Sequence, residues 1–215
     1  MQTILLRAAA PSAIEYALEL IQRGEVVAIP TDTVYGIAAD GYNADAIEKL
    51  FVAKERPPHK AIQLLVADLQ DLERVATYVS PMARALAEKF WPGGLTLVVT
   101  ARADLPANLR ADTNTVGVRL PDAPVVRELA RALGRPLAAT SANRSGGANP
   151  RTAQDVLNDL GGRIPLILDG GATPGNVAST VLDCTQDTPR VLRVGALRLE
   201  DIAQALNLPR EMLHE

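Results

Sequence analysis

Three short polar segments, far apart in the sequence, concentrate side chains that a hydrophobic core does not need. They are PTDTVYG (30–36), KERPPHK (54–60) and TSANRSG (140–146). Guanidinium and ammonium groups bind the oxygens of phosphates and carboxylates, while hydroxyl and amide groups orient small polar ligands. If the fold brings the three segments together, they predict a pocket for an anionic ligand.

The second segment supplies the cations. Lys54 and Arg56 occupy alternate positions at the end of a predicted helix, and Lys60 follows after two prolines. An arginine can bind two oxygens of one phosphate at once, while a lysine provides a movable point charge. Cations at a helix end can also simply complement the helix dipole in solvent, so the motif alone leaves both interpretations open. In either case we expect Lys54 and Arg56 to lie outside the hydrophobic core.

Hydroxyl and amide side chains stand at the ends of two predicted strands. Thr31 and Thr33 end one apolar run, and Ser141 and Asn143 follow another. Ligands of open α/β sheets bind beyond the strand ends, which favours a binding site. The same residue types also form turns that satisfy their own backbone groups, and this alternative remains open for each segment taken alone.

Two arginines end apolar strands in a similar way. Arg119 ends TVGVR, and Arg193 lies near the end of RVLRVG. A lone arginine at such a place is often the partner of a structural ion pair. Several strand ends that each carry a hydroxyl, an amide or a guanidinium group can nevertheless converge on one cleft, where they would neutralise a phosphate and bind a polar substrate.

The composition excludes several classes of protein. At 215 residues, with 47% hydrophobic and 22% charged residues, the chain is typical of a globular fold. A net charge of −3 and only 3% aromatic residues argue against a general nucleic-acid binder. The single cysteine excludes an internal disulfide. We find no apolar run of about 18 residues and no basic region before a signal-like stretch, so we expect no membrane segment, no signal peptide and a cytoplasmic location.

Common catalytic motifs are absent. The sequence has no Gly-Lys pair and therefore no P-loop, no GxGxxG after a strand, no HExxH and no GxSxG. Its only histidines are His59 and His214, and its only cysteine is Cys184, so a Cys/His metal cage cannot be built. These absences leave chemistry by positioning and charge.

The apolar periodicity predicts helices and strands in alternation. Ser12 and Glu15 predict a capping box, and Ser80 and Thr152 predict the caps of two further helices. Strands with and without intervening helices predict one α/β domain, residues 1–215, with a mixed sheet flanked by helices. The predicted strands are 25–31, 61–68, 95–102, 115–121, 136–143, 165–171, 179–185 and 189–195; the predicted helices run from Ser12 to Gly24 and from Ser80 to Pro92, and over 44–54, 69–78, 124–134, 152–160 and 197–206.

The order and wording of the segments resemble the YrdC-like family of threonylcarbamoyl-AMP synthases. The matching motifs span about residues 10–206, and the resemblance is to the short, single-domain form without a further C-terminal domain. The family usually has proline where this sequence has Ala61 and Val194. The motifs are PTDTVYG, AKERP, FWPGGLTLV, TVGVRLP, TSANRSG, STVLD and RVLRVG.

The resemblance implies a fold and a reaction. The expected fold is a twisted mixed sheet around a concave, positively charged cavity. The expected reaction combines L-threonine, bicarbonate and ATP into threonylcarbamoyl-adenylate and releases pyrophosphate. The product would feed the formation of threonylcarbamoyladenosine in tRNA, which implies tRNA-modification proteins as possible partners.

The resemblance also implies roles for individual residues. Lys54 and Arg56 are expected to be catalytic because they hold the phosphates of ATP, and Arg119 is expected to bind the threonine carboxylate. Mg²⁺ is expected to arrive on the ATP phosphates, without a metal site of the protein's own. The expected ATP-binding residues are Lys54, Arg56, Lys60, Thr115, Ser141, Asn143, Asn149 and Arg193; the expected threonine-binding residues are Thr33, Arg119, Ala139 and Thr140.

Two other functions remain open at this point. A YciO-like paralogue would bind a nucleotide but use a different acceptor, so it would not turn over threonine. An RNA-binding protein would use the same basic cavity for a nucleic-acid backbone, and its binding would depend strongly on salt.

Overall fold

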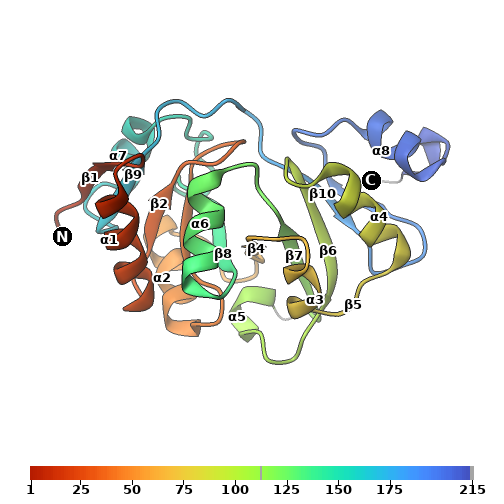
Figure 1. Ribbon diagram of the computed structural model, residues 1–215, viewed down its shortest axis with the longest axis horizontal. Coiled ribbons are helices and arrows are strands. Elements are labelled where there is room, and N and C mark those ends of the chain that lie inside the picture. Colours follow the sequence, from red (N-terminus) through yellow and green to blue (C-terminus); the bar gives the residue numbers. More distant parts are fainter. Residues whose placement is uncertain (112, 214–215) are drawn as a thin grey trace.

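The computed structural model describes residues 1–111 and 113–213; His214, one of the two histidines, lies outside them. Within these residues eleven strands form one sheet in the order β1-β9-β2-β3-β8-β4-β7-β6-β10-β11, with β5 paired to β6 beside this path. The sheet extends along the long axis of the molecule, with the N-terminus near one end and α8 near the other (Figure 1). No helix of the described residues is both long and apolar enough to cross a membrane.

Helices and strands alternate along most of the chain. The strands are β1 (Ile4–Arg7), β2 (Val27–Ile29), β3 (Gly36–Asp40), β4 (Gln63–Leu65), β5 (Ala76–Tyr78), β6 (Leu95–Ala101), β7 (Thr115–Arg119), β8 (Leu137–Ser141), β9 (Leu166–Asp169), β10 (Thr180–Asp183) and β11 (Arg190–Arg193). The helices are α1 (Pro11–Gln22), α2 (Ala44–Lys54), α3 (Asp71–Val75), α4 (Pro81–Phe90), α5 (Ala107–Arg110), α6 (Pro124–Leu133), α7 (Ala153–Leu160) and α8 (Leu199–Leu206), followed by the 3₁₀ turn Arg210–Met212.

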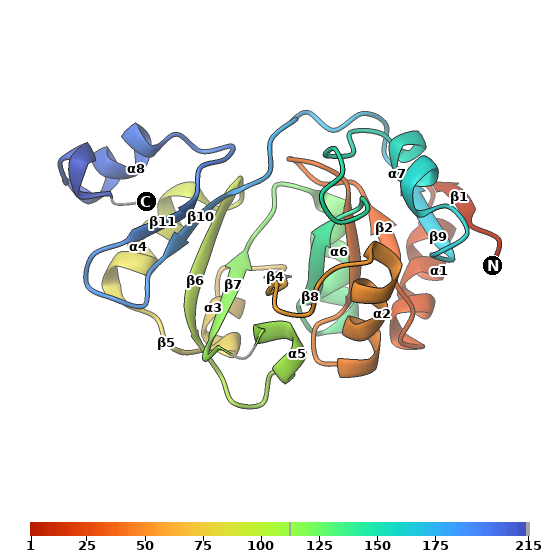
Figure 2. The ribbon, with the colours of Figure 1, turned by 180° about the vertical axis from the view of Figure 1, so that it is seen from behind.

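The sheet is mixed, as the sequence predicts. Strand β4 is parallel to β7 and antiparallel to β8, and β6 is parallel to β10 and antiparallel to β7. Figure 2, seen from behind, shows β4, β7 and β6 running side by side through the middle of the molecule. The α/β class with a mixed sheet flanked by helices is therefore confirmed.

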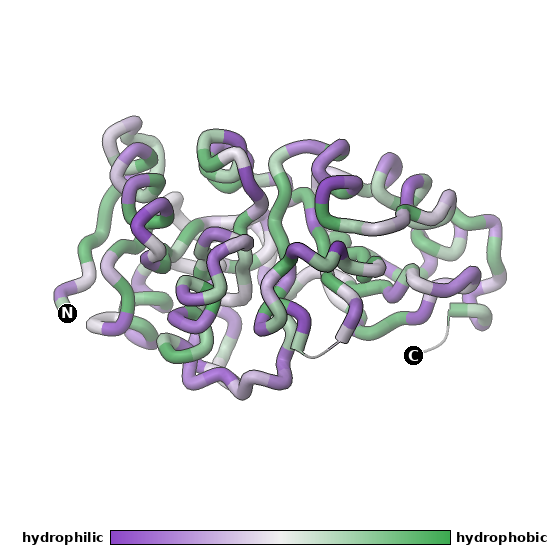
Figure 3. Tube along the Cα trace, turned by 90° about the horizontal axis from the view of Figure 1, so that it is seen from below, coloured by the Kyte–Doolittle hydropathy of each residue, from purple (hydrophilic) through white to green (hydrophobic). Residues whose placement is uncertain are grey.

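Hydrophobic residues fill both faces of the sheet. Successive residues of a strand point to opposite faces, and Leu64 and Leu65 accordingly belong to two different buried clusters. One cluster joins α1 and α6 to the sheet, and the other includes α2, α4, α7 and α8. Figure 3 shows hydrophobic and hydrophilic residues alternating around the outer helices, as their amphipathic sequences require.

The helix caps confirm two predictions and correct one. Ser80 accepts a hydrogen bond from the backbone N–H of Ala83, and Thr152 forms a reciprocal capping box with Asp155. The predicted capping box of Ser12 and Glu15 is wrong. Helix α1 begins one residue earlier, at Pro11, so Ser12 already lies inside the helix and Ala10 is the cap residue, without a side-chain bond.

Tertiary contacts change three other parts of the prediction. The predicted helix 69–78 ends early, because Ala76–Tyr78 pairs with β6 as strand β5. Strand β3 was not predicted, since all five of its residues are buried and its GIAAD sequence shows no alternation of polar and apolar residues. Strand β1 was not predicted either; it lies at the edge of the sheet, parallel to β9.

The capping box of α7 gives a stability test. Replacing Thr152 by Ala removes the side-chain acceptor of the Asp155 N–H, and we expect the unfolding free energy to fall by about 1 kcal/mol. Urea denaturation measures the change. Thr152→Ser keeps a hydroxyl and should lose much less; an equal loss in the two variants would contradict a capping role.

Candidate functional site

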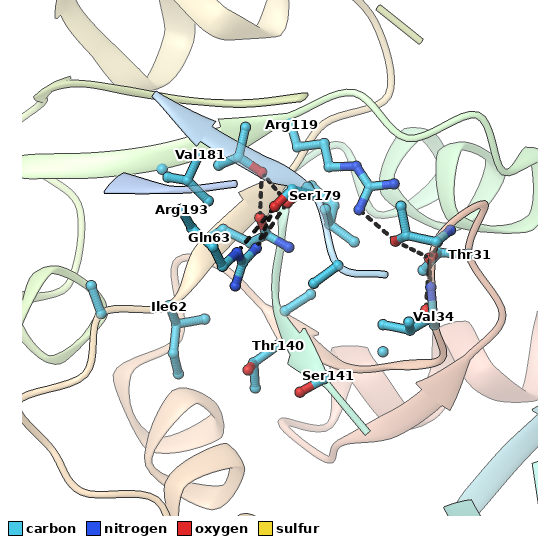
Figure 4. A pocket seen from close by; sticks show the side chains of 18 of the residues that line it. Thr31, Val34, Ile62, Gln63, Arg119, Thr140, Ser141, Ser179, Val181 and Arg193 are labelled. Atoms are coloured by element: carbon cyan, nitrogen blue, oxygen red, sulfur yellow. Dashed lines mark hydrogen bonds between the residues drawn. The ribbon is translucent and has the colours of Figure 1, made fainter. Parts of the chain in front are cut away.

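A cavity of about 320 Å³ opens on one face of the sheet. Side chains from β4, β6, β7, β8, β10 and β11 form its floor, and the segments that enter β3 and β4 form its walls. Figure 4 shows Gln63, Ser179 and Arg193 gathered in one group, with Arg119 linked towards Thr31 in another. The lining residues are Thr31, Thr33, Val34, Tyr35, Gly36, Arg56, Ala61, Ile62, Gln63, Leu65, Thr96, Val98, Gly117, Arg119, Ala139, Thr140, Ser141, Asn149, Ala178, Ser179, Val181, Leu192 and Arg193.

Strand register explains why these residues meet. Leu65 of β4 lies opposite Arg119 of β7, so Gln63 and Gly117, two residues earlier on each strand, share the same face. Gly117 lies in turn opposite Val98 of β6. A Cβ at Gly117 would lie 3.2 Å from Thr96 Cγ2 and 3.5 Å from Gln63 Cβ. The missing side chain therefore leaves the floor of the cavity open.

Arg119 is an almost fully buried cation, with 2% of its surface exposed. Its Nη2 donates to Asp32 Oδ1 at 2.5 Å, its Nη1 to Thr33 Oγ1 at 2.9 Å and its Nε to the Gly93 carbonyl at 2.9 Å. Burial lowers the pKa of Arg119, and the Asp32 carboxylate opposes this effect. Three of the five N–H groups of the guanidinium are used by these bonds, and the other two have no acceptor among the described residues.

The hydroxyls of Thr31 and Thr33 form one hydrogen-bonded group beside Arg119. Thr31 Oγ1 donates to the Val34 carbonyl at 2.7 Å and accepts from the backbone N–H groups of Thr33 and Val34 at 3.1 and 3.3 Å. It lies 3.0 Å from Thr33 Oγ1, and either hydroxyl can donate this bond. Thr33 Oγ1 also accepts from Arg119, so it links the guanidinium to the turn before β3.

Arg56 and Arg193 bind no carboxylate among the described residues. Arg56 donates to the carbonyls of Lys60 and Ala61, and Arg193 donates to the carbonyl and hydroxyl of Ser179. Burial lowers the pKa of Arg56 and, to a smaller extent, so does the charge of Arg193. Burial likewise lowers the pKa of Arg193, with the charge of Arg119 as the second cause. A bound anion would relieve this mutual repulsion.

Lys54 does not occupy the exposed helix end expected for it. Its side chain is 1% exposed, and its Nζ donates at 2.5 Å to the carbonyls of Ser141 and Asn143 and at 3.3 Å to Asn143 Oδ1. Burial lowers its pKa to about 7. The expectation that Lys54 lies outside the core is therefore wrong: this lysine holds the turn after β8, and its ammonium group is not part of the cavity lining.

The backbone conformation of Glu55 places the side chains of Lys54 and Arg56 in different directions. Glu55 has a left-handed conformation, with φ 52°, that ends α2 after Lys54. Its carboxylate turns away from the cavity to bind Arg144 and Arg163, at 2.5 and 2.7 Å. This turn lets Lys54 reach the Ser141–Asn143 turn while Arg56 reaches the cavity.

The structure brings most, but not all, of the predicted site residues to the cavity. Asn143 is buried and holds Gly147 through its amide, Lys60 is exposed, and the Thr115 hydroxyl contacts Thr113 at 3.0 Å. These three residues and Lys54 are not among the lining residues. The predicted residues that line the cavity are Thr33, Arg56, Arg119, Ala139, Thr140, Ser141, Asn149 and Arg193.

The sequence did not reveal the polar group formed by Gln63, Thr96 and Ser179. Thr96 Oγ1 donates to Gln63 Oε1 at 2.8 Å and lies 2.7 Å from Ser179 Oγ. Each residue is a lone polar side chain at the start of an apolar strand, and this is the only signal that could have indicated them. Among the described residues, no group of three or more His, Cys, Asp and Glu side chains could hold a metal ion.

The low pKa of Lys54 predicts a dependence of stability on pH. Between pH 7 and its ordinary value of 10.5 the unfolded chain binds a proton that the folded protein does not, so the unfolding free energy rises with pH in this range. Compared with Lys54→Met, the wild type should gain stability from about pH 7 to about pH 9.5, as measured by urea denaturation. Lys49→Met, at a half-exposed lysine, is the matched control. A flat or falling difference for Lys54 would contradict a depressed pKa.

Comparisons with known proteins agree with this architecture. The model of the Sua5/YciO/YrdC family, described as telomere recombination, matches residues 19–195. A threonylcarbamoyl-AMP synthase of Bacillus subtilis is 43% identical over 190 residues, which cover 88% of this chain and 55% of that protein. The chain thus spans little more than half the length of this curated relative.

Solved structures show the same similarity. Sua5 of Pyrococcus abyssi, determined in complex with L-threonine, is 37% identical with a TM-score of 0.91, over 96% of this chain and 61% of that one. YciO of Escherichia coli is 27% identical with a TM-score of 0.82, over 94% of this chain and 98% of that one. The chain belongs to the Sua5/YciO/YrdC family.

Proposed function

We propose that this protein makes threonylcarbamoyl-adenylate from L-threonine, bicarbonate and ATP and releases pyrophosphate. One observation carries the proposal: a cavity lined by three arginines and several hydroxyl groups lies in a chain that closely matches a synthase relative crystallised with L-threonine. The positive character of the cavity is part of the proposal. It is supported by Arg56 and Arg193, which have no carboxylate partner among the described residues.

The proposed threonine site lies at Arg119. The N–H groups of Arg119 that face no protein acceptor would bind the substrate carboxylate, as a second carboxylate beside that of Asp32. Thr33, which lines the cavity beside Arg119, would contact the substrate amine through its hydroxyl. Ala139 and Thr140 line the same part of the cavity through β8 and would complete the site.

The proposed ATP site lies at Arg56 and the turn after β8. Arg56 and Arg193 would bind the phosphates, and Ser141 and Asn149 would contact the nucleotide from the opposite wall. Lys54 would act as a positioning residue, because its ammonium group fixes the turn that carries Ser141. Asn143 would act in the same way.

Of the two remaining residues expected to bind ATP, Lys60 and Thr115, we keep only Lys60 in the proposed site. The exposed Lys60 follows Arg56 and could approach a triphosphate from the rim of the cavity. Thr115 lies at the opposite end of β7 from Arg119, with its hydroxyl engaged by Thr113, so we leave it out of the proposed site.

The chemistry needs no covalent enzyme intermediate. The lone pair of the threonine amine attacks the carbon of carbon dioxide derived from bicarbonate, one C=O π bond opens to place the charge on oxygen, and the nitrogen loses a proton to solvent, which gives the carbamate. Direct attack on bicarbonate gives the same carbamate with loss of water. A carbamate oxygen then attacks the α-phosphorus of ATP, the bond to the bridging oxygen breaks, and pyrophosphate leaves. Arg56 and Arg193 would stabilise the negative charge that accumulates on the phosphates, and Mg²⁺ would enter with ATP.

We also propose which kind of partner consumes the product and where in the cell the protein acts. Threonylcarbamoyl-adenylate is a reactive mixed anhydride, so a tRNA-modifying partner would have to consume it by transferring the threonylcarbamoyl group to tRNA and releasing AMP. A reaction that uses ATP and serves tRNA fits a cytoplasmic location.

A second candidate function is that of a paralogue with another acceptor. The match to YciO, which extends over nearly all of that protein, favours it. Such a paralogue would bind ATP in the same cavity but would not release pyrophosphate in response to threonine.

Pyrophosphate release separates the two candidates. We expect release from ATP only when threonine and bicarbonate are both present, and loss of release when either is left out. Binding of ATP without threonine-dependent release would overturn the proposed synthase and support the paralogue.

Removing the guanidinium of Arg56 should disable the reaction. We expect Arg56→Ala to lower kcat/KM for ATP by about 100-fold, because a charge-assisted contact to the phosphates is lost. Arg56→Lys should recover part of the loss, and Arg23→Ala, at an exposed arginine paired with Glu19, should have no effect. Normal turnover in a folded Arg56→Ala protein would exclude a phosphate contact at this position.

The hydroxyl of Ser141 should matter for ATP rather than for threonine. We expect Ser141→Ala to raise KM for ATP about tenfold and to leave KM for threonine nearly unchanged, because one neutral hydrogen bond is lost at the nucleotide. Steady-state kinetics with each substrate varied in turn measures both constants. An unchanged KM for ATP would mean that Ser141 only shapes its turn.

A further inference from the structure

Gln63 presents an amide group on the floor of the cavity, at the start of β4. It is half-buried and lines the cavity, and Gly117 lies between it and Thr96. Ala61, Ile62, Val98 and Val181 are apolar lining residues from the neighbouring chain segments. Gln63 therefore belongs to a small polar group, with Thr96, Ser179 and Arg193, that has apolar neighbours.

The directions of the hydrogen bonds in this group follow from the Thr96–Gln63 bond together with Arg193. A guanidinium can only donate, so Ser179 Oγ accepts from Arg193 Nη2 at 3.1 Å. Thr96 uses its single hydroxyl proton on Gln63 Oε1. The 2.7 Å bond between the hydroxyls of Thr96 and Ser179 must then be donated by Ser179.

These hydrogen bonds determine which atom of the Gln63 amide can bind a ligand. Its Oε1 accepts from Thr96, and its Nε2 has no hydrogen-bond partner in the part of the chain that the structure describes. Since Oε1 is held towards Thr96, the Nε2 group is the free end of the amide. Gln63 can therefore donate to an oxygen of a ligand through Nε2.

The distance between Gln63 and the buried guanidinium of Arg119 suits one small amino acid. Gln63 lies beside Gly117, and Arg119 is two residues further along β7, which is about 7 Å along an extended strand. An amino acid whose carboxylate binds Arg119 would extend its side chain over Gly117 towards the amide. The apolar neighbours would accept a methyl group there.

We propose that Gln63 donates a hydrogen bond to the side-chain hydroxyl of threonine and is the specificity-determining residue of the amino-acid site. This inference rests on the proposed function, since it assigns a role within the same reaction. Thr96, Ser179 and Arg193 act as positioning residues that orient the amide.

The test compares threonine with valine, in which a methyl group replaces the hydroxyl. The readout is pyrophosphate release with each amino acid, expressed as the ratio of kcat/KM for threonine to kcat/KM for valine. In Gln63→Met, which keeps the length of the side chain and removes the donor, we expect this ratio to fall at least about tenfold. Gln204→Met, on the exposed face of α8, is the matched control and should keep the wild-type ratio.

A second pair of variants tests, without changing Gln63, whether the hydroxyl of Thr96 orients the Gln63 amide. Thr96→Val removes the hydroxyl that holds Oε1, and we expect the threonine-to-valine ratio to fall as in Gln63→Met. Thr96→Ser keeps the hydroxyl and should retain most of the ratio. Equal ratios in the two Thr96 variants would overturn the orientation argument.

The outcomes separate this inference from the proposed function. If the wild type releases pyrophosphate with threonine and Gln63→Met keeps the wild-type ratio, Gln63 does not read the hydroxyl, and the synthase proposal stands. If the wild type shows no release with either amino acid, the proposed function has failed and the inference fails with it.

Discussion

The buried guanidinium of Arg119 is the interaction on which the site depends. A cation that is almost withdrawn from water is tolerated only with partners for its charge and its N–H groups, and the loss of one partner from a buried pair costs about 3–5 kcal/mol. Here the partners come from different parts of the chain: Asp32 and Thr33 before β3, and the Gly93 carbonyl before β6. Arg119 thereby joins β7 to the segments that precede β3 and β6, and the proposed threonine site uses the same guanidinium.

A second constraint comes from the alternation of side chains along the central strands. On β4 and β7 one face carries Leu64 and Val118, which fill the core, and the opposite face carries Gln63 and Gly117, which form the floor of the cavity. The floor of the cavity thus lies on the strand face opposite Leu64 and Val118, while Leu65, on the cavity face, also packs in the core cluster with α1 and α6. Within the core region, the buried ammonium group of Lys54 holds a turn of the site.

The sequence predicted those elements whose signals are local. Caps at Ser80 and Thr152 and the apolar strands β6 and β7 follow from residues within a few positions of one another. Strand β3 could not be predicted in this way, since its burial depends on neighbours distant in sequence. The contacts of Gln63 and Ser179 with Thr96 likewise join residues 33 and 83 positions apart, and only the sheet register brings them together. For Lys54 the sequence indicated a helix end correctly, but it could not indicate that the end is covered by the turn after β8.

In the proposed site one cavity holds the amino acid at Arg119 and the nucleotide phosphates at Arg56. The decisive experiment is a crystal structure of the protein with L-threonine and a non-hydrolysable ATP analogue. We expect the threonine carboxylate on the N–H groups of Arg119 and the phosphates against Arg56, with both ligands in the same cavity. A nucleotide bound elsewhere, or a carboxylate bound away from Arg119, would contradict this arrangement.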